Sequence, residues 1–489
     1  MKLTEWRICR IIVCAYAMSL IGSTRGEETT GARPTPLTRP ELKLLIEDVK
    51  VRVPRIPLPE LTEQDREKLG DQVESYESRL RYHYLNGIEP SRDIRIGQPV
   101  PAANVAGTGQ RTGFSREQDP AFSLDQAFKV ELFWIVSRVN NCQYCLGHQE
   151  SKLLGAGHSD DQIAALDGDW SEFEPAKKLA YSFARKLSYQ PHLLGDGDIA
   201  GLQAYYSDKQ ILEMILSMCG NNSINRWKEG VGVPQRKDEG GYSRRVGLGE
   251  GGTIPTEIDS KFPRGTYLTP TSSAYEKMVT SVAVLAMDQT SGRQVCATQS
   301  KRPPLESREQ VEKTLNACKS RKSRLALVDA SQARIDIPGS DMIEGVLPNW
   351  VRLLANFPKA GASRFESFRG VNEKGSLSPL FKAQLNWILA RQDRAWYALG
   401  LARNRLRELG QTENQIYALD GDWSQFSASE RALFQVSRQL ATSPVVLTDN
   451  EVATAVQLAG PSDVVQAINY TTSRASFNRL TEAAGLPLE

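Results

Sequence analysis

The sequence predicts an all-α fold built from two copies of one helical domain. Apolar residues recur at helical spacing through most of residues 125–234, where no convincing alternating strand pattern appears. The segment KVELFWIVSR, which starts at Lys129, returns as KAQLNWILAR at Lys382, 253 residues later. LDGDWSEF at Leu166 returns as LDGDWSQF at Leu419 with the same offset. These observations together predict an internal duplication.

The offset holds over about a hundred residues without a gap. It also joins Arg185 to Arg438, Pro191 to Pro444, Asn225 to Asn478, Arg226 to Arg479 and Pro234 to Pro487. The period is too long, and the copies are too few, for a solenoid. Two copies of one domain are therefore the interpretation that the repeat supports.

Length and composition are those of a soluble globular protein. The 489 residues predict two to four domains. The content of 40% hydrophobic and 24% charged residues is ordinary. A net charge of +2 is too small to indicate nucleic acid or an anionic membrane, so neither is expected as a partner.

The N-terminus has the pattern of a secretory signal peptide at residues 1–26. Lys2, Arg7 and Arg10 precede an apolar run at residues 11–21 that is too short to span a bilayer. Small residues near Gly26 suit cleavage there. We therefore expect a secreted or periplasmic protein; an uncleaved anchor and a misplaced start codon are the alternatives.

Composition divides the rest of the chain into four parts. We expect an N-terminal extension, partly disordered, at residues 27–93, and the first copy at residues 94–239. A linker with an elaboration follows at residues 240–346, and the second copy occupies residues 347–489. Within the first copy, helices are predicted at residues 129–138, from about 142, at 160–166, at 174–187, at 196–206 and at 208–219, and residues 221–229 close the unit.

Two cysteines in C-x-x-C spacing, Cys142 and Cys145, stand where the second of these helices begins. Asn140 and Asn141 before them suit a turn and an N-cap. Residues three and four apart share a helix face, so the two thiols are expected to lie together. His148 or Gln149 would follow one turn later.

This placement favours redox chemistry. A thiol at a helix N-terminus is stabilised as the thiolate by the macrodipole and the free N–H groups. One thiolate can attack an oxidant, and its partner can resolve the product as a disulfide. Glu131 on the preceding helix and His148 could move the protons.

Other uses of the cysteine pair fit less well. Zinc needs about four ligands, and the sequence has no second C-x-x-C and no H-x-x-x-H. Covalent haem needs a histidine directly after the second cysteine, where Leu146 stands. No metal and no cofactor are therefore expected, and an inert structural disulfide stays open as an alternative.

Seven cysteines occur in all, and Cys9 and Cys14 would leave with the signal peptide. Five remain, an odd number that implies at least one free thiol. Cys219 lies in an apolar helical segment and is expected to be buried. Cys296 and Cys318 could form a structural disulfide.

The second copy lacks the polar groups nominated above. The offset pairs Cys142 with Ala395, Cys145 with Ala398, His148 with Leu401, Gln149 with Ala402 and Glu131 with Gln384. Packing residues persist, as Trp134 and Trp387, Tyr144 and Tyr397, and Gly147 and Gly400 show. LDGDW, Asn225 and Arg226 persist too, which favours structural roles for them. The comparison of the two copies separates residues that serve packing from residues that are candidates for chemistry.

Glu131, the pattern N-x-C-x-Y-C-x-x-H from Asn140, Gly157 and the DDQIAAL helix resemble one known family. It is the AhpD-like alkylhydroperoxidase branch of the carboxymuconolactone decarboxylase superfamily. The resemblance covers residues 94–234, and residues 347–487 resemble a degenerate copy.

The resemblance implies an all-α fold in which two tandem AhpD-like domains pack as an intrachain pseudo-dimer, and a tendency to form homo-oligomers. It implies that Cys145 is the peroxidatic thiol, Cys142 the resolving thiol, Glu131 the proton-relay carboxylate and His148 the imidazole. The family histidine usually stands four residues after the second cysteine, the position of Gln149 here.

The sequence thus predicts a thiol-dependent peroxidase with a peroxide substrate and an unidentified dithiol reductant. One alternative is lactone chemistry of the carboxymuconolactone decarboxylase type, which does not need the cysteine pair. Another is a non-catalytic scaffold with a structural disulfide. A thiol–disulfide oxidoreductase is the third, although no thioredoxin-like βαβ pattern surrounds the pair.

Overall fold

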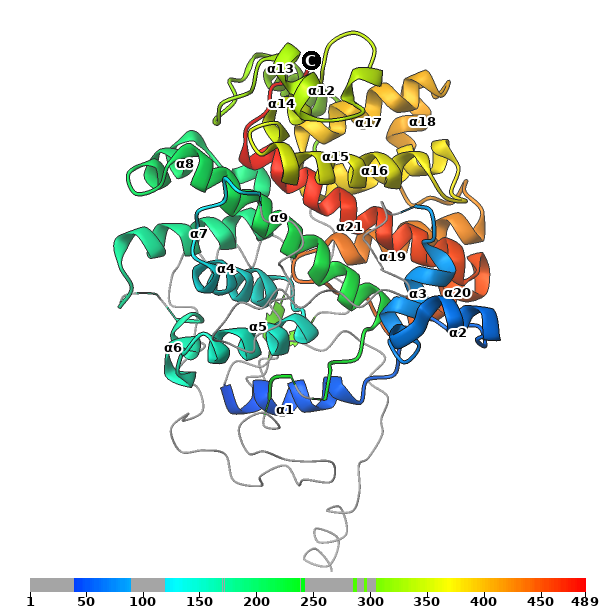
Figure 1. Cartoon of the computed structure of the whole chain (residues 1–489). Coiled ribbons are helices and arrows are strands. Elements are labelled where there is room, and N and C mark those ends of the chain that lie inside the picture. The colour runs from blue at the N-terminus through cyan, green and yellow to red at the C-terminus, as the bar shows by residue number, and fades with distance from the viewer. Residues whose placement is uncertain are drawn as a thin grey trace, which may run out of the picture.

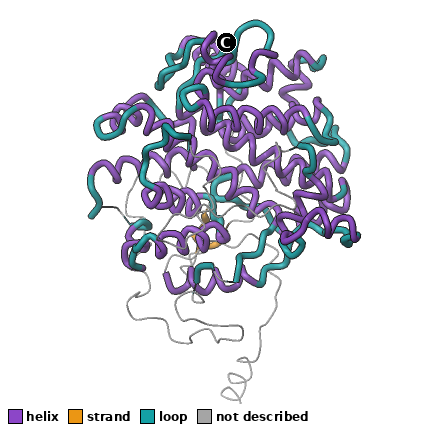
Figure 2. Tube along the Cα trace, in the orientation of Figure 1, coloured by secondary structure: helices purple, strands orange, loops and turns teal. Residues whose placement is uncertain are grey.

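The structure is a computed structural model that describes residues 39–88, 119–168, 170, 172–237, 239–241, 285–287, 294–296 and 305–489. The predicted signal peptide lies outside these residues. The described part is helical apart from one antiparallel pair of three-residue strands, β1 (Leu285–Met287) and β2 (Gln294–Cys296). Figure 2 shows helices throughout the body of the molecule. The predicted all-α fold class is confirmed.

The helices recur with the offset seen in the sequence. The first copy contains α4 (Gln126–Val139), α5 (Gln143–Gly155), α6 (Asp160–Ala165), α7 (Pro175–Tyr189), α8 (Asp196–Gln203) and α9 (Asp208–Val231). The second contains α16 (Pro379–Asp393), α17 (Trp396–Glu408), α18 (Glu413–Ala418), α19 (Ala428–Ala441), α20 (Asp449–Ala459) and α21 (Pro461–Ala483). Each helix of the second copy begins 253 residues after its counterpart.

Unusual backbone positions recur as well. Asn141 and Arg394 lie in the left-handed region at φ 57° and 51°, and Trp170 and Trp423 lie there at 62° and 61°. Few non-glycine residues adopt such angles, so their recurrence at one offset shows that the turns are duplicated along with the helices.

The LDGDW segment ties two helices together in each copy. Trp134 Nε1 donates to Asp167 Oδ1 at 3.0 Å, and Trp387 donates to Asp420 at 2.9 Å. This shared contact agrees with the structural role that the sequence favoured for the segment.

The structure joins the predicted helix at 208–219 and the closing segment at 221–229 into the single helix α9. Gly220 lies inside it, where a glycine weakens a helix. A Cβ at Gly220 would stand 2.9 Å from Arg364 Nη2, and this guanidinium donates to Leu216 O at 2.8 Å. Gly220 therefore makes room for an arginine from α15 (Pro358–Glu373).

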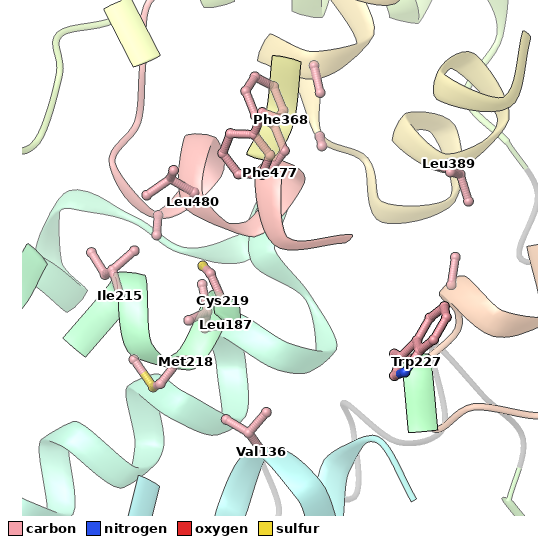
Figure 3. Close-up of a cluster of buried hydrophobic side chains, with 14 of the residues drawn as sticks. Val136, Leu187, Ile215, Met218, Cys219, Trp227, Phe368, Leu389, Phe477 and Leu480 are labelled. Carbon is pink, nitrogen blue, oxygen red and sulfur yellow. The ribbon is translucent and has the colours of Figure 1, made fainter. Parts of the chain in front are cut away.

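The two longest of the described helices, α9 and α21, run side by side through the centre of the molecule (Figure 1). Helices α4, α5, α7 and α8 pack on α9, and α16, α17, α19 and α20 pack on α21. Figure 3 shows one buried cluster that takes Val136, Leu187 and Met218 from the first copy and Leu389 and Phe477 from the second. The two copies therefore share one hydrophobic core.

Each copy carries one further helix that the sequence repeat did not reveal. Helix α1 (Arg39–Lys50) packs on α5, and α12 (Arg308–Ser320) packs on α17. Gln235 N donates to Val49 O at 3.0 Å, and the equivalent bond from Leu488 N to Cys318 O is 3.1 Å. Helices α1 and α12 are thus equivalent, with an offset of 269 instead of 253.

The remaining elements surround this duplicated body. They are α2 (Glu63–Leu69), η1 (Gly70–Gln72), α3 (Tyr76–Tyr84), η2 (Pro191–Leu193), α13 (Ala330–Asp336), η3 (Ser340–Met342) and α14 (Asn349–Leu354), in addition to α15. None of the described helices combines the length and apolar character that crossing a membrane requires.

Gly230→Ala should destabilise the packing between the copies. A Cβ at Gly230 would stand 2.7 Å from Ile468 Cγ2 on α21 and 3.2 Å from Leu440 Cδ2 on α19. Overpacking of this kind costs about 1–3 kcal/mol. Gly197→Ala is the matched control, because nothing lies within 4 Å of its added Cβ. Urea denaturation should show a loss for the first variant only, and equal midpoints would contradict the packing described.

Candidate functional site

The two sulfurs of the C-x-x-C pair are bonded to each other at the start of α5. Cys142 and Cys145 form a disulfide with a Cα–Cα distance of 5.3 Å. Cys142 is the N-cap of α5, and its Sγ accepts the backbone N–H of Cys145 at 3.2 Å. The expected proximity of the two cysteines is therefore present, and Cys142 caps the helix in place of an asparagine.

The two asparagines form the turn that presents the cysteines. Asn140 ends α4, and Asn141 takes the left-handed conformation that asparagine tolerates best among non-glycine residues. Cys142 N then donates to Ser137 O at 3.0 Å. The sequence prediction of a turn here is correct, and the turn places Cys142 Sγ 3.2 Å from the backbone nitrogen of Cys145.

The second copy fixes this turn from outside. Ser443 Oγ donates to Asn140 Oδ1 at 2.9 Å, and Val445 N donates to Asn140 O at 3.2 Å. Arg226 on α9 donates to Asn140 Oδ1 at 3.1 Å and to Ser443 Oγ at 2.7 Å. Arg479 on α21 reaches Ser443 Oγ at 3.3 Å. Asn140, Arg226, Ser443 and Arg479 are called the interface network below.

The two arginines of the interface network differ in their hydrogen-bond and ion-pair partners. Arg479 pairs with Asp393 at 3.2 Å, and Asp393 occupies the position equivalent to Asn140. Arg226 bonds only neutral oxygens among the described residues, and its Nε has no hydrogen-bond partner there. Burial, followed by repulsion from Arg479, lowers the pKa of Arg226, but a guanidinium stays charged in proteins. A buried positive charge without a carboxylate partner therefore bonds the turn just before Cys142.

Glu131 lies in a separate cluster further back along α4. Its carboxylate lies 2.9 Å from His158 Nε2, accepts both hydrogen bonds of Lys177 Nζ at 2.9 Å and accepts the Tyr181 hydroxyl at 2.6 Å. Burial, followed by the charge of Glu131, raises the pKa of Tyr181. Eight residues of helix separate Glu131 from Val139 at the end of α4, which is about 12 Å along the axis. The carboxylate is therefore held away from the cysteine turn.

His148 does not meet Glu131. Its Nδ1 lies 3.0 Å from Glu239 Oε2, and its ring stacks on Tyr144 at a centroid distance of 6.5 Å. Gln149, one turn after Cys145 at i+4, is buried, and its Oε1 has no hydrogen-bond partner among the described residues. The structure thus brings the two cysteines together but does not gather Glu131 and His148 into one relay.

Sequence reasoning did not nominate His158, Lys177 and Tyr181. A signal for them was nevertheless present, because the offset pairs them with Gln411, Glu430 and Phe434. All three change character in the second copy, as Glu131 does.

The other described thiols lie outside the site. Cys219 is buried in the shared core, as predicted (Figure 3), and burial raises its pKa to about 12. Cys318 is a free, buried thiol, and burial raises its pKa to about 11. The suggested disulfide between Cys296 and Cys318 is therefore absent, because Cys318 Sγ lies instead 3.7 Å from Leu486 O.

Neither the protein-family models nor the curated protein sequences contain a match to this chain.

Thiol labelling should separate these cysteines. Iodoacetamide at pH 8 should leave Cys219 and Cys318 unmodified in the folded protein, since both are buried thiols with raised pKa values. Cys142 and Cys145 are equally buried, but a dithiol that reduces their bond must reach the sulfurs. Iodoacetamide should then reach and modify them as well. Mass spectrometry of the cysteine-containing peptides measures both results, and an unfolded sample reduced with dithiol is the control in which all four react. Labelling of Cys219 without denaturant would contradict the burial described.

Proposed function

We propose that this protein is a thiol-dependent peroxidase of the AhpD-like type, with Cys142 and Cys145 as its redox pair. The bonded pair at the start of α5, which follows a turn that the buried Arg226 bonds through Asn140, is the observation that carries the proposal. Helix N-termini and nearby cations both lower the pKa of a thiol. The second copy has Ala395 and Ala398 at these positions and a carboxylate, Asp393, that neutralises Arg479.

The proposed cycle has three steps. The Cys145 thiolate attacks the terminal oxygen of a hydroperoxide, the O–O bond breaks, and the alkoxide leaves as the alcohol after taking up one proton. Cys145 is then a sulfenic acid. The Cys142 thiol attacks its sulfur, forms the disulfide and releases water. An external dithiol returns two electrons and two protons and is itself oxidised.

The duplicated architecture supports a pseudo-dimer interpretation. The second copy covers the cysteine turn through Ser443 and Val445, a role that a second subunit fills in oligomeric members of the resembled family. In the proposal, the second copy keeps the packing and has no redox pair of its own. Export and assembly into a homo-oligomer complete the proposal.

Glu131 and His148 have different roles in the proposed cycle. Glu131 is fully bonded by Lys177 and Tyr181, together with His158, and joins α4 to α7. We assign it an anchoring role in preference to the proton relay that the resemblance implies. His148 is partly exposed one turn after Cys145 and is the proposed proton donor to the leaving alkoxide.

Burial of the disulfide favours a second candidate. Cys142 is 0% exposed and Cys145 2% exposed, which is typical of a structural disulfide in a non-catalytic scaffold. The two candidates differ in how readily a dithiol reduces the bond. In the peroxidase, the cover over the pair must open to admit a reductant, so stoichiometric reduction by excess dithiothreitol should proceed in the folded protein.

Cys145→Ala should abolish peroxide reduction, whereas Cys142→Ala should leave a single turnover that ends at the sulfenic acid. Alanine is the appropriate substitute because the second copy packs Ala395 and Ala398 at the same places. Consumption of cumene hydroperoxide with dithiothreitol measures turnover of wild type and Cys145→Ala. For Cys142→Ala, the reduced protein is freed of dithiothreitol and given hydroperoxide alone, and dimedone labelling then detects the sulfenic acid. The conservative control is Cys318→Ala, distant from the pair in sequence. Equal activity of Cys145→Ala and wild type would refute the proposal.

His148→Leu and Glu131→Gln should separate proton transfer from anchoring, since each introduces the residue of the second copy. Loss of a general acid costs about 100-fold or more in rate, so His148→Leu should slow turnover while thermal stability stays near wild type. Glu131→Gln weakens charge-assisted hydrogen bonds worth about 1–3 kcal/mol. It should lower the melting temperature and keep the rate per folded molecule within about twofold. A slow but fully stable Glu131→Gln variant would instead support the relay.

A further inference from the structure

Lys43 lies in the interior of the first copy, in contact with two carboxyl groups. Its Nζ lies 2.8 Å from Glu150 Oε1 and 3.1 Å from Asp160 Oδ1. The three side chains come from α1, α5 and α6, and each is at most 1% exposed. Lys43 is the least exposed lysine of the described residues. An amine and two carboxyl groups therefore meet where bulk water does not reach them.

Glu150 is placed to take a proton from this amine. Burial favours the neutral form of an amine, and ions taken out of water remain costly even when they are paired. Glu150 Oε1 is the nearer of the two acceptors to Lys43 Nζ, and Glu150 Oε2 accepts the backbone N–H of Gly241 at 2.7 Å. That hydrogen bond stabilises the carboxylate form of Glu150, which a general base must have.

Asp160 is the carboxyl group that the neutral amine can attack. Its Cγ is one bond away from the Oδ1 that already contacts Lys43 Nζ. Groups held together in this way react as if one of them were present at about 10⁵–10⁸ M. Such proximity favours condensation to an amide, which bulk water would otherwise oppose.

The condensation is balanced without any further reactant. The Nζ–Cγ bond forms, and one C–O bond of Asp160 breaks. The oxygen leaves as water with two of the three hydrogens of the Lys43 ammonium, one of them carried by Glu150. The product is a neutral amide, and its remaining N–H can donate to Glu150, so the buried charges of Lys43 and Asp160 disappear.

The second copy has a related ion cluster that cannot react in this way. With the offsets given above, the counterparts of the three side chains are Glu312, Arg403 and Glu413. Arg403 is the shared cation, and a guanidinium stays protonated in proteins. Glu312 and Glu413 are also partly exposed. Of these two clusters, only that of the first copy combines an amine with full burial.

Another buried lysine of the first copy provides an internal comparison. Lys129 Nζ lies 2.9 Å from Glu213 Oε1, and among the described residues it contacts no second carboxylate. Glu213 Oε2 accepts the backbone N–H groups of Ser123 and Leu124. No second carboxylate is placed to take a proton from Lys129, so this contact should remain an ion pair.

We propose that Lys43 and Asp160 become joined by an isopeptide bond in the folded protein, with Glu150 as the catalytic base. The bond ties α1 to the first residue of α6 and closes a covalent loop that contains the cysteine pair. It does not depend on the redox activity proposed for that pair.

Mass spectrometry of the purified full chain, after denaturation and reduction, tests this proposal. The wild-type chain should be lighter, by one water molecule, than the sequence that starts at its observed N-terminus. Digestion should yield one branched peptide that contains both Lys43 and Asp160. Lys43→Arg keeps the positive charge but has no amine, so its mass should equal that of its sequence.

Two further variants test the role of the base. Loss of a general base slows a reaction about 100-fold or more, so freshly purified Glu150→Gln should be mostly unlinked. Lys129→Arg is the matched control and should remain linked.

The wild-type chain decides the proposal even if a variant fails to fold. A wild-type mass equal to that of the sequence, with trypsin cleaving after Lys43, would overturn it. A bond from Lys43 to Glu150, or complete linkage in Glu150→Gln, would overturn the assigned roles.

Discussion

Two buried arginines at the centre of the molecule hold the two copies together through hydrogen bonds. Arg226 from α9 and Arg479 from α21 both reach Ser443, and Arg479 also donates to Ser188 O at 2.9 Å while Arg226 donates to Ala441 O at 3.2 Å. Each guanidinium thus uses carbonyls of the opposite copy as acceptors. A buried charge that loses its partners is costly, so neither copy can leave the other without exposing or stranding an arginine.

This contact reaches the cysteines because Asn140 belongs to it. The same side chain that receives Arg226 begins the turn into α5, and the second copy bonds its carbonyl through Val445. At the equivalent turn of the second copy, Asp393 replaces Asn140 and forms an ion pair with Arg479, whereas Arg226 bonds the neutral Asn140. One substitution thus gives the two copies different electrostatic environments on the same backbone.

The repeated sequence segments predicted most of the helices and the duplication. They persist because residues such as Trp134 and Asp167 make the same packing contact as their equivalents in the second copy. They did not predict that α1 and α12 are equivalent. These helices share only two identities, Arg39 with Arg308 and Lys50 with Lys319, and their offset differs from that of the rest. The cysteine pair was predictable from helix geometry alone. The surroundings of Glu131 were not, since His158 and Lys177 approach it from elements that no local spacing connects to α4.

Helices α1 and α12 cover equivalent parts of the two copies, but the ion pairs beneath them have opposite polarity. Lys43 on α1 lies 2.8 Å from Glu150 and 3.1 Å from Asp160, whereas Glu312 on α12 pairs with Arg403, which also bonds Glu413 at 2.7 Å. If the covering helices exchanged places, Lys43 would face Arg403, and Glu312 would face two carboxylates. Tandem domains of similar sequence are prone to misassembly as they fold, and like charges at a wrong pairing oppose it. The opposite charges beneath α1 and α12 therefore oppose an exchange of these two helices between the copies.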